Sequence, residues 1–182
     1  MQMSGQTVVN KGVNGWKTTN LIADFATNVI AAHPEYVIIM GGTNDAWTTA
    51  SLTAMQARWS QYNLDPANAP NTPVNTIFNN LKYLAEQSVA NGIKPIMVVE
   101  PGQVNEANDT DANLVYLWDM VRAYAKEMNY PLIDFYRCTR PGGPGTPFDE
   151  SLLYTNDFHF NEAGYRKMAL VAAKVLESLR DF

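Results

Sequence analysis

The chain has 182 residues and a formal net charge of -5, a length at which one domain is expected, here over residues 1–182. The acidic balance argues against nucleic acid or an anionic membrane surface as the main partner, and the single cysteine, Cys138, excludes an internal disulfide. No apolar run approaches the roughly 18 residues of a membrane span, and residues 1–6 lack the basic and apolar regions of a signal peptide, so we expect a soluble protein whose compartment the sequence leaves open.

The first part of the chain predicts a short strand followed by a helix. Thr7–Asn10 has the composition of a strand, and the loop after it contains Gly15, whose missing Cβ allows a positive φ or a close approach of its N–H to a ligand. Residues 18–30 show the helical apolar period, with one of the two threonines at the start as the expected cap. Pro34 ends this helix, and we assign His33 to the helix end, without a catalytic role.

A second strand is predicted over Tyr36–Met40, and it ends in the glycine pair at 41 and 42. Its unbroken apolar run is typical of a strand buried on both faces. Asn44 follows the carboxyl end of this strand, which is where ligands bind in open parallel α/β sheets. An amide placed there can donate a hydrogen bond to a developing oxyanion, a contact whose removal costs a hydrolase roughly 10²–10³ in rate. The other interpretation is that residues 43–45 only cap the next turn, since Asn and Asp are favoured in turns.

A long connection over residues 46–72 follows, and its second half is too rich in Pro and Asn for regular structure. Connections of this length are often binding loops or lids, and others are simple insertions. The aromatic residues Trp47, Trp59 and Tyr62 either line a substrate groove or pack against the domain. The sequence leaves both interpretations open.

The rest of the chain alternates helices and strands. We predict a helix from about residue 74 to 90 that ends at Asn91-Gly92, a strand over Lys94–Glu100, a helix around residues 114–128, a strand over Pro131–Tyr136 and a final helix after Asn161. Such an alternation implies a parallel sheet with right-handed crossovers and helices on both faces. The predicted fold class is therefore α/β.

His159 lies in a loop just ahead of the final helix, with Asp157 two residues before it. A histidine held by a neighbouring acid is what a general base needs, because the acid fixes the tautomer and stabilises the imidazolium. The other interpretation is a surface histidine in a capping segment whose N-cap is Asn161. Taken alone, this segment does not decide between them.

Three separated pieces, Asn10–Gly15, Gly41–Asp45 and Asp157–Tyr165, resemble the second, third and fifth sequence blocks of the SGNH (GDSL-like) hydrolases in order and approximate spacing. The resemblance runs over essentially the whole chain. It implies a three-layer, flavodoxin-like α/β fold with a parallel sheet.

By motif position, the resemblance also implies site residues. Gly15 and Asn44 would be the oxyanion donors, and His159 would be the base. Members of this family hydrolyse acyl esters of lipids, small alcohols and acetylated sugars through a serine nucleophile. They need no metal, so we expect neither a metal nor a cofactor.

The chain departs from the family at the nucleophile. The family's first block, Gly-Asp-Ser at the end of the first strand, occurs nowhere in this sequence. Ser4 lies where the family has the end of its first helix, directly before the strand predicted over Thr7–Asn10, and is a poor substitute. We therefore expect the chain to begin after the nucleophile strand, at an internal methionine.

The family's sheet order, 2-1-3-4-5, would place that missing first strand between Thr7–Asn10 and Tyr36–Met40. Unsatisfied buried backbone groups cost about 1–3 kcal/mol each. We therefore expect either a segment from outside this chain to fill the gap, or the two flanking strands to have closed up against each other.

A second departure concerns the acid. The family usually places Asp three residues before the histidine, and Asn156 occupies that position here. An Asn can orient an imidazole but cannot stabilise its cation as a carboxylate does. Asp157 is our candidate for the role, and a backbone carbonyl in a Ser-His dyad is the alternative.

The sequence therefore favours a serine ester hydrolase of the SGNH type that is inactive as this fragment because its nucleophile is absent. Trp16 beside Gly15, together with Trp47 and Trp59, favours an acylated carbohydrate over a long acyl chain as the substrate. The alternative is a non-catalytic carbohydrate-binding or structural module that retains the pocket of this fold.

Overall fold

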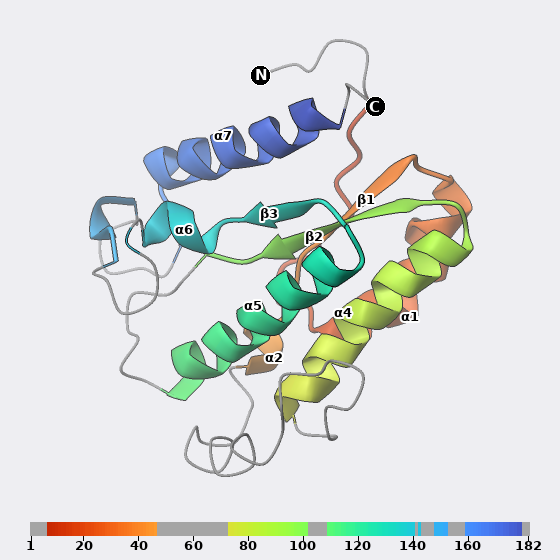
Figure 1. The fold of residues 1–182 in the computed structure, drawn as a ribbon, viewed down its shortest axis with the longest axis horizontal. Coiled ribbons are helices and arrows are strands. Elements are labelled where there is room, and N and C mark those ends of the chain that lie inside the picture. The colour runs from red at the N-terminus through yellow and green to blue at the C-terminus, as the bar shows by residue number, and fades with distance from the viewer. Residues whose placement is uncertain are drawn as a thin grey trace.

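The computed structural model describes residues 7–46, 73–101, 109–140, 142, 148–152 and 159–179. Within these ranges the sheet has three parallel strands in the order β1-β2-β3 (Figure 1). The strands are β1 (Tyr36–Ile39), β2 (Lys94–Val99) and β3 (Leu132–Asp134). The predicted α/β class and the parallel sheet are confirmed. The order β1-β2-β3 corresponds to the last three strands, 3-4-5, of the expected order 2-1-3-4-5.

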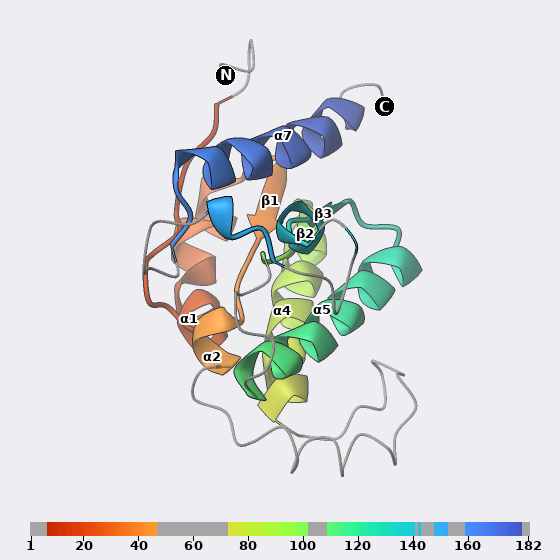
Figure 2. The same cartoon turned by 90° about the vertical axis from the view of Figure 1, so that its left-hand side faces the viewer.

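Helices cover both faces of this sheet, as the alternation of elements predicts. α1, α4 and α5 lie on one face, and α7 lies on the other (Figure 2). The helices are α1 (Thr18–Asn28), α2 (Thr43–Ala46), α4 (Pro73–Ala90), α5 (Asp109–Glu127), α6 (Tyr136–Thr139) and α7 (Glu162–Ser178), with 3-10 helices η1 (Ile30–Ala32) and η2 (Glu150–Leu152).

The two faces of the middle strand belong to two hydrophobic clusters. Met97 and Val99 face the larger cluster, which the sheet shares with α1, α4 and α5. Ile96 and Val98 face the smaller cluster beneath α7. Because side chains alternate along a strand, burial on both sides requires the continuous apolar run seen in β2.

Strand β1 is less buried than the sequence predicts for Tyr36–Met40. Ile39 is buried in the larger cluster, whereas Ile38 on the opposite face is 48% exposed. The prediction that this strand is buried on both faces was therefore wrong. The reason is its place in the sheet: among the described residues β1 is an edge strand, paired with β2 alone.

The strand predicted over Thr7–Asn10 was also wrong, because the structure has no regular element there. Val8 and Val9 are 77% and 67% exposed. A strand forms only where a neighbouring strand supplies hydrogen bonds, and residues 7–10 are not part of the sheet. The expectation that this segment closes up against β1 is therefore wrong as well.

Some predicted features lie outside the described residues. They are Ser4, the aromatic residues Trp47, Trp59 and Tyr62, and the acid candidates Asn156 and Asp157.

Candidate functional site

The turn after β1 can be built only with glycine. Gly42 has a φ of 131°, and a Cβ at this position would meet Leu117 Cδ2 at 2.6 Å. The chain therefore passes close to α5 and enters α2, which packs against α4 and α5. This turn places Asn44 at the carboxyl end of β1 with its side chain exposed.

The amide of Asn44 is held by the loop that contains Gly15. Asn44 Nδ2 donates a hydrogen bond of 2.9 Å to the backbone carbonyl of Trp16. Gly15 has a φ of 77°, with open space where a Cβ would lie, and it is exposed beside the half-buried Trp16. The structure thus brings the two predicted oxyanion donors into neighbouring segments.

Asp45 joins the same helix to α1. Its carboxylate accepts hydrogen bonds from Thr18 N at 2.9 and 3.1 Å and from Thr18 Oγ1 at 2.7 Å. The N-cap position belongs to Lys17, so the prediction that Thr18 or Thr19 caps α1 was wrong. A carboxylate from a distant turn satisfies the free N–H instead and complements the positive end of the helix dipole.

Glu100 is a residue that the sequence analysis missed. It follows the last residue of β2, is only 8% exposed, and accepts a hydrogen bond of 3.0 Å from Thr43 N and a second one from Thr43 Oγ1. Burial raises the pKa of this carboxyl group, and the nearby Asp45 carboxylate adds to the rise, against the two bonds from Thr43. A charged residue directly after an apolar strand was the available sequence signal.

His159 comes from a different layer of the fold. It is exposed in the segment before α7, and that segment is fixed by Asn161, whose side chain accepts from Gly164 N at 3.0 Å and donates to Ser151 O at 2.7 Å. Asn161 is the N-cap of α7, as the alternative interpretation of this segment had it.

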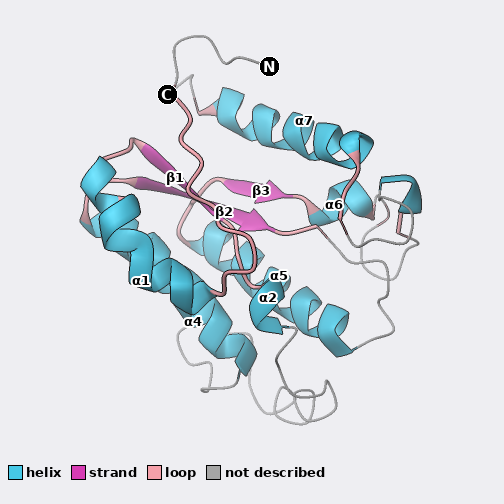
Figure 3. Ribbon diagram, turned by 180° about the vertical axis from the view of Figure 1, so that it is seen from behind, coloured by secondary structure: helices cyan, strands magenta, loops and turns pink. Residues whose placement is uncertain are grey.

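The strands point toward the region where these residues lie. Figure 3 shows that β2 and β3 point toward α6 and the N-terminal end of α7, which His159 precedes. Asn44 reaches the carboxyl end of the sheet from the α4 and α5 side, whereas His159 reaches it from the α7 side.

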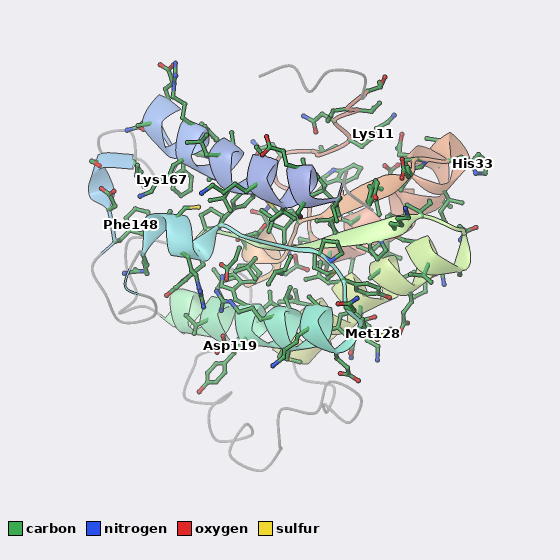
Figure 4. The ribbon with its side chains drawn as sticks, turned by 45° about the horizontal axis from the view of Figure 1, so that its top comes forward. Lys11, His33, Asp119, Met128, Phe148 and Lys167 are labelled. Atoms are coloured by element: carbon green, nitrogen blue, oxygen red, sulfur yellow. The ribbon has the colours of Figure 1, made fainter. Side chains whose placement is uncertain are left out.

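The second histidine lies elsewhere. Figure 4 shows His33 at the opposite end of the molecule from Phe148 and Lys167, which lie near α6 and α7. His33 has a φ of 47° and ends η1. This left-handed conformation at a helix end agrees with the structural role predicted for it.

Among the described residues, no group of three or more His, Cys, Asp or Glu side chains is placed to hold a metal ion. None of the described helices is long and apolar enough to cross a membrane.

Solved structures with the same fold include esterases. A GDSL-like lipase from Bacteroides thetaiotaomicron matches with a TM-score of 0.69 at 21% identity, over 92% of this chain and 75% of that one. An acetylxylan esterase from Geobacillus stearothermophilus also gives a TM-score of 0.69 at 21% identity, over 92% of this chain and 70% of that one. At these identities the likeness establishes the fold alone.

Sequence comparison identifies the family. An uncharacterized lipoprotein of Bacillus subtilis (strain 168), YqeF, is 28% identical over 167 residues, which cover 80% of this chain and 61% of that relative. The chain thus spans about three fifths of the length of this relative. The profile of the GDSL-like Lipase/Acylhydrolase family matches residues 2–167. Because this match covers most of the sequence, the chain belongs to the GDSL-like lipase/acylhydrolase family.

Proposed function

We propose that this chain forms the oxyanion-binding and general-base part of a serine ester hydrolase. The observation that supports it most directly is the hydrogen bond from Asn44 Nδ2 to Trp16 O, at the carboxyl end of β1. An amide nitrogen has two hydrogens, so this bond uses one and fixes the direction of the other. With the N–H of Gly15 one residue away from Trp16, the arrangement suits an oxyanion.

His159 is the proposed general base, and Asp157 is the proposed acid that orients it. The base removes the proton of the serine hydroxyl as the serine attacks the ester carbonyl, and returns it to the departing alcohol. It then activates the water that releases the acyl group from the serine. Gly15 and Asn44 stabilise the negative charge on the carbonyl oxygen in both steps.

The serine itself would come from a strand outside this sequence, docked on the edge of β1 that no described strand occupies. Two observations support this part of the proposal. The sequence contains no Gly-Asp-Ser, and Ile38 in β1 and Met40 directly after the strand are about half exposed. A strand laid beside β1 would satisfy its backbone groups and cover this apolar surface.

The proposed substrate class is an acylated carbohydrate. Trp16 and Trp47 would supply flat apolar surfaces for a sugar ring, and Trp16 is half-buried next to Gly15. One structure of the same fold is an acetylxylan esterase. This preference for a sugar ester rests on analogy.

An active-site-directed fluorophosphonate tests the enzyme and its nucleophile together. We would label the chain alone, and also the longer product of its coding sequence with whatever precedes Met1 in frame, and map the modified serine by mass spectrometry. Hydrolysis of p-nitrophenyl acetate would be measured in parallel.

The proposal is supported if the reagent labels a serine that precedes Met1 and if only the longer product hydrolyses p-nitrophenyl acetate. Label on one of the six serines of this chain would contradict an external nucleophile. Neither label nor hydrolysis in either form would favour the alternative that the absence of Gly-Asp-Ser suggests, a non-catalytic carbohydrate-binding module.

A further inference from the structure

Glu100 is unusual among the acidic residues of this protein. Among the residues whose side-chain burial the structure describes, it is the only Asp or Glu that is buried. Burying a carboxyl group is unfavourable unless hydrogen bonds compensate for the lost water. Here the compensation comes from Thr43 N and Thr43 Oγ1, both of which donate to Oε2.

Thr43 is the first residue of α2 and directly precedes Asn44. A helix of four residues has no stability of its own, because helix nucleation is costly. The direction of α2 therefore depends on the contacts that its residues make with the rest of the fold.

Three consecutive residues make those contacts, each to a different element. Thr43 is bonded to Glu100 after β2, Asn44 to Trp16 before α1, and Asp45 to Thr18 in α1. Asn44, the proposed oxyanion donor, thus lies between two residues that each bond to another part of the fold, Thr43 to Glu100 and Asp45 to Thr18.

We propose that Glu100 is a positioning residue, which fixes the side-chain amide of Asn44 by holding Thr43 at the start of α2. This inference rests on the proposed function for its catalytic meaning, but the geometry can be tested without any activity. In this role Glu100 itself contacts neither the substrate nor the reacting atoms.

The test compares Glu100→Ala with Glu100→Gln in ¹⁵N-labelled chain. Glutamine keeps an acceptor oxygen for Thr43, whereas alanine leaves the N–H and hydroxyl of Thr43 without it. The readout is the pair of Asn44 side-chain NH₂ signals in a ¹H-¹⁵N correlation spectrum, assigned by their loss in Asn44→Asp. We expect the signals to move or broaden in Glu100→Ala and to be restored in Glu100→Gln.

The matched control is Asp134→Ala. Asp134 ends β3. It accepts hydrogen bonds from Arg122 at 2.9 and 3.2 Å and forms an ion pair with Arg137, and neither arginine belongs to α2. This variant should leave the Asn44 signals in place. If Glu100→Ala does not fold, Thr43→Val, which removes the hydroxyl and keeps the N–H, should move the same signals to a smaller extent.

In the complete hydrolase, Glu100→Ala should lower kcat by up to roughly 10²-fold, the scale of losing one oxyanion donor, with little change in KM. Glu100→Gln should restore most of this loss. Unmoved Asn44 signals in a folded Glu100→Ala protein would overturn the positioning role. Shifted signals in a protein without any hydrolysis would instead count against the proposed function and leave the positioning role supported.

Discussion

Asp45 receives both the backbone N–H and the hydroxyl of Thr18, at 2.9 and 2.7 Å. Thr18 is fully buried, and its hydroxyl also accepts a hydrogen bond from Asn80 Nδ2 at 2.9 Å. One carboxylate thus joins α2, α1 and, through Thr18, α4.

Replacing this carboxylate should destabilise the fold. We expect Asp45→Ala to lower the free energy of unfolding by about 1–3 kcal/mol, because the buried N–H and hydroxyl of Thr18 lose their acceptor. Urea denaturation followed by circular dichroism measures this. Glu162→Ala is the control, since Glu162 lies in the first turn of α7 but is exposed and pairs with Arg166. This variant should lower the free energy of unfolding by no more than about 0.5 kcal/mol. Equal losses in the two variants would contradict the role of Asp45.

The glycine turn gives a second prediction. Gly42→Ala should cost more stability than Gly15→Ala, although both positions have positive φ. Both variants incur the strain of that backbone conformation, about 1–3 kcal/mol. At Gly42 the new Cβ also overlaps Leu117, whereas at Gly15 it enters open space. Thermal unfolding of the two variants checks the order, and a larger loss in Gly15→Ala would contradict the close packing at Gly42.

The titration of Glu100 predicts how stability changes with pH. Its pKa is raised in the folded protein, so between the ordinary glutamate pKa of about 4.3 and the raised value the folded state holds a proton that the unfolded state has released. Glu100 therefore contributes to the free energy of unfolding below this pH window, and this contribution is lost as the pH rises through it.

Glu100→Gln removes this titration. We expect the variant to gain stability relative to the original chain as pH increases from about 4.3, measured as urea midpoints from acidic to neutral pH. A difference between Glu100→Gln and the original chain that is constant with pH would contradict the raised pKa.

The two histidines allow a direct comparison in the proposed hydrolase. His159→Ala should reduce kcat by several orders of magnitude, and Asn44→Ala by about 10²–10³. His33→Asn is the matched control, because Asn accepts the left-handed conformation that His33 adopts. Turnover by His33→Asn should equal that of the original enzyme. Unchanged turnover in both His159→Ala and Asn44→Ala would end the proposed mechanism.

The elements that the sequence predicted well are those set by local patterns. The apolar periods of α4 and α7 place them correctly, Asn161 caps α7 as expected, and the continuous apolar run of β2 matches a strand buried on both faces. Each of these features depends on residues a few positions apart, so the sequence contains the necessary information.

The features that were missed depend on distant partners. Residues 7–10 have strand composition, but pairing decides whether a strand forms. The exposure of Ile38 follows from its place at the edge of the described sheet. The roles of Asp45 and Glu100 arise only when β1, β2 and α1 are brought together, because their partners Thr18 and Thr43 are distant in the sequence.

The bond between Asn44 and Trp16 also bears on how this scaffold can accommodate different esters. It ties α2 to the start of α1, so the spacing between the two proposed donors is set within one layer of the molecule. His159 belongs to the layer across the sheet. In the proposed enzyme, sliding α7 relative to the sheet would therefore widen or narrow the room for an acyl group while the pair of donors kept its geometry.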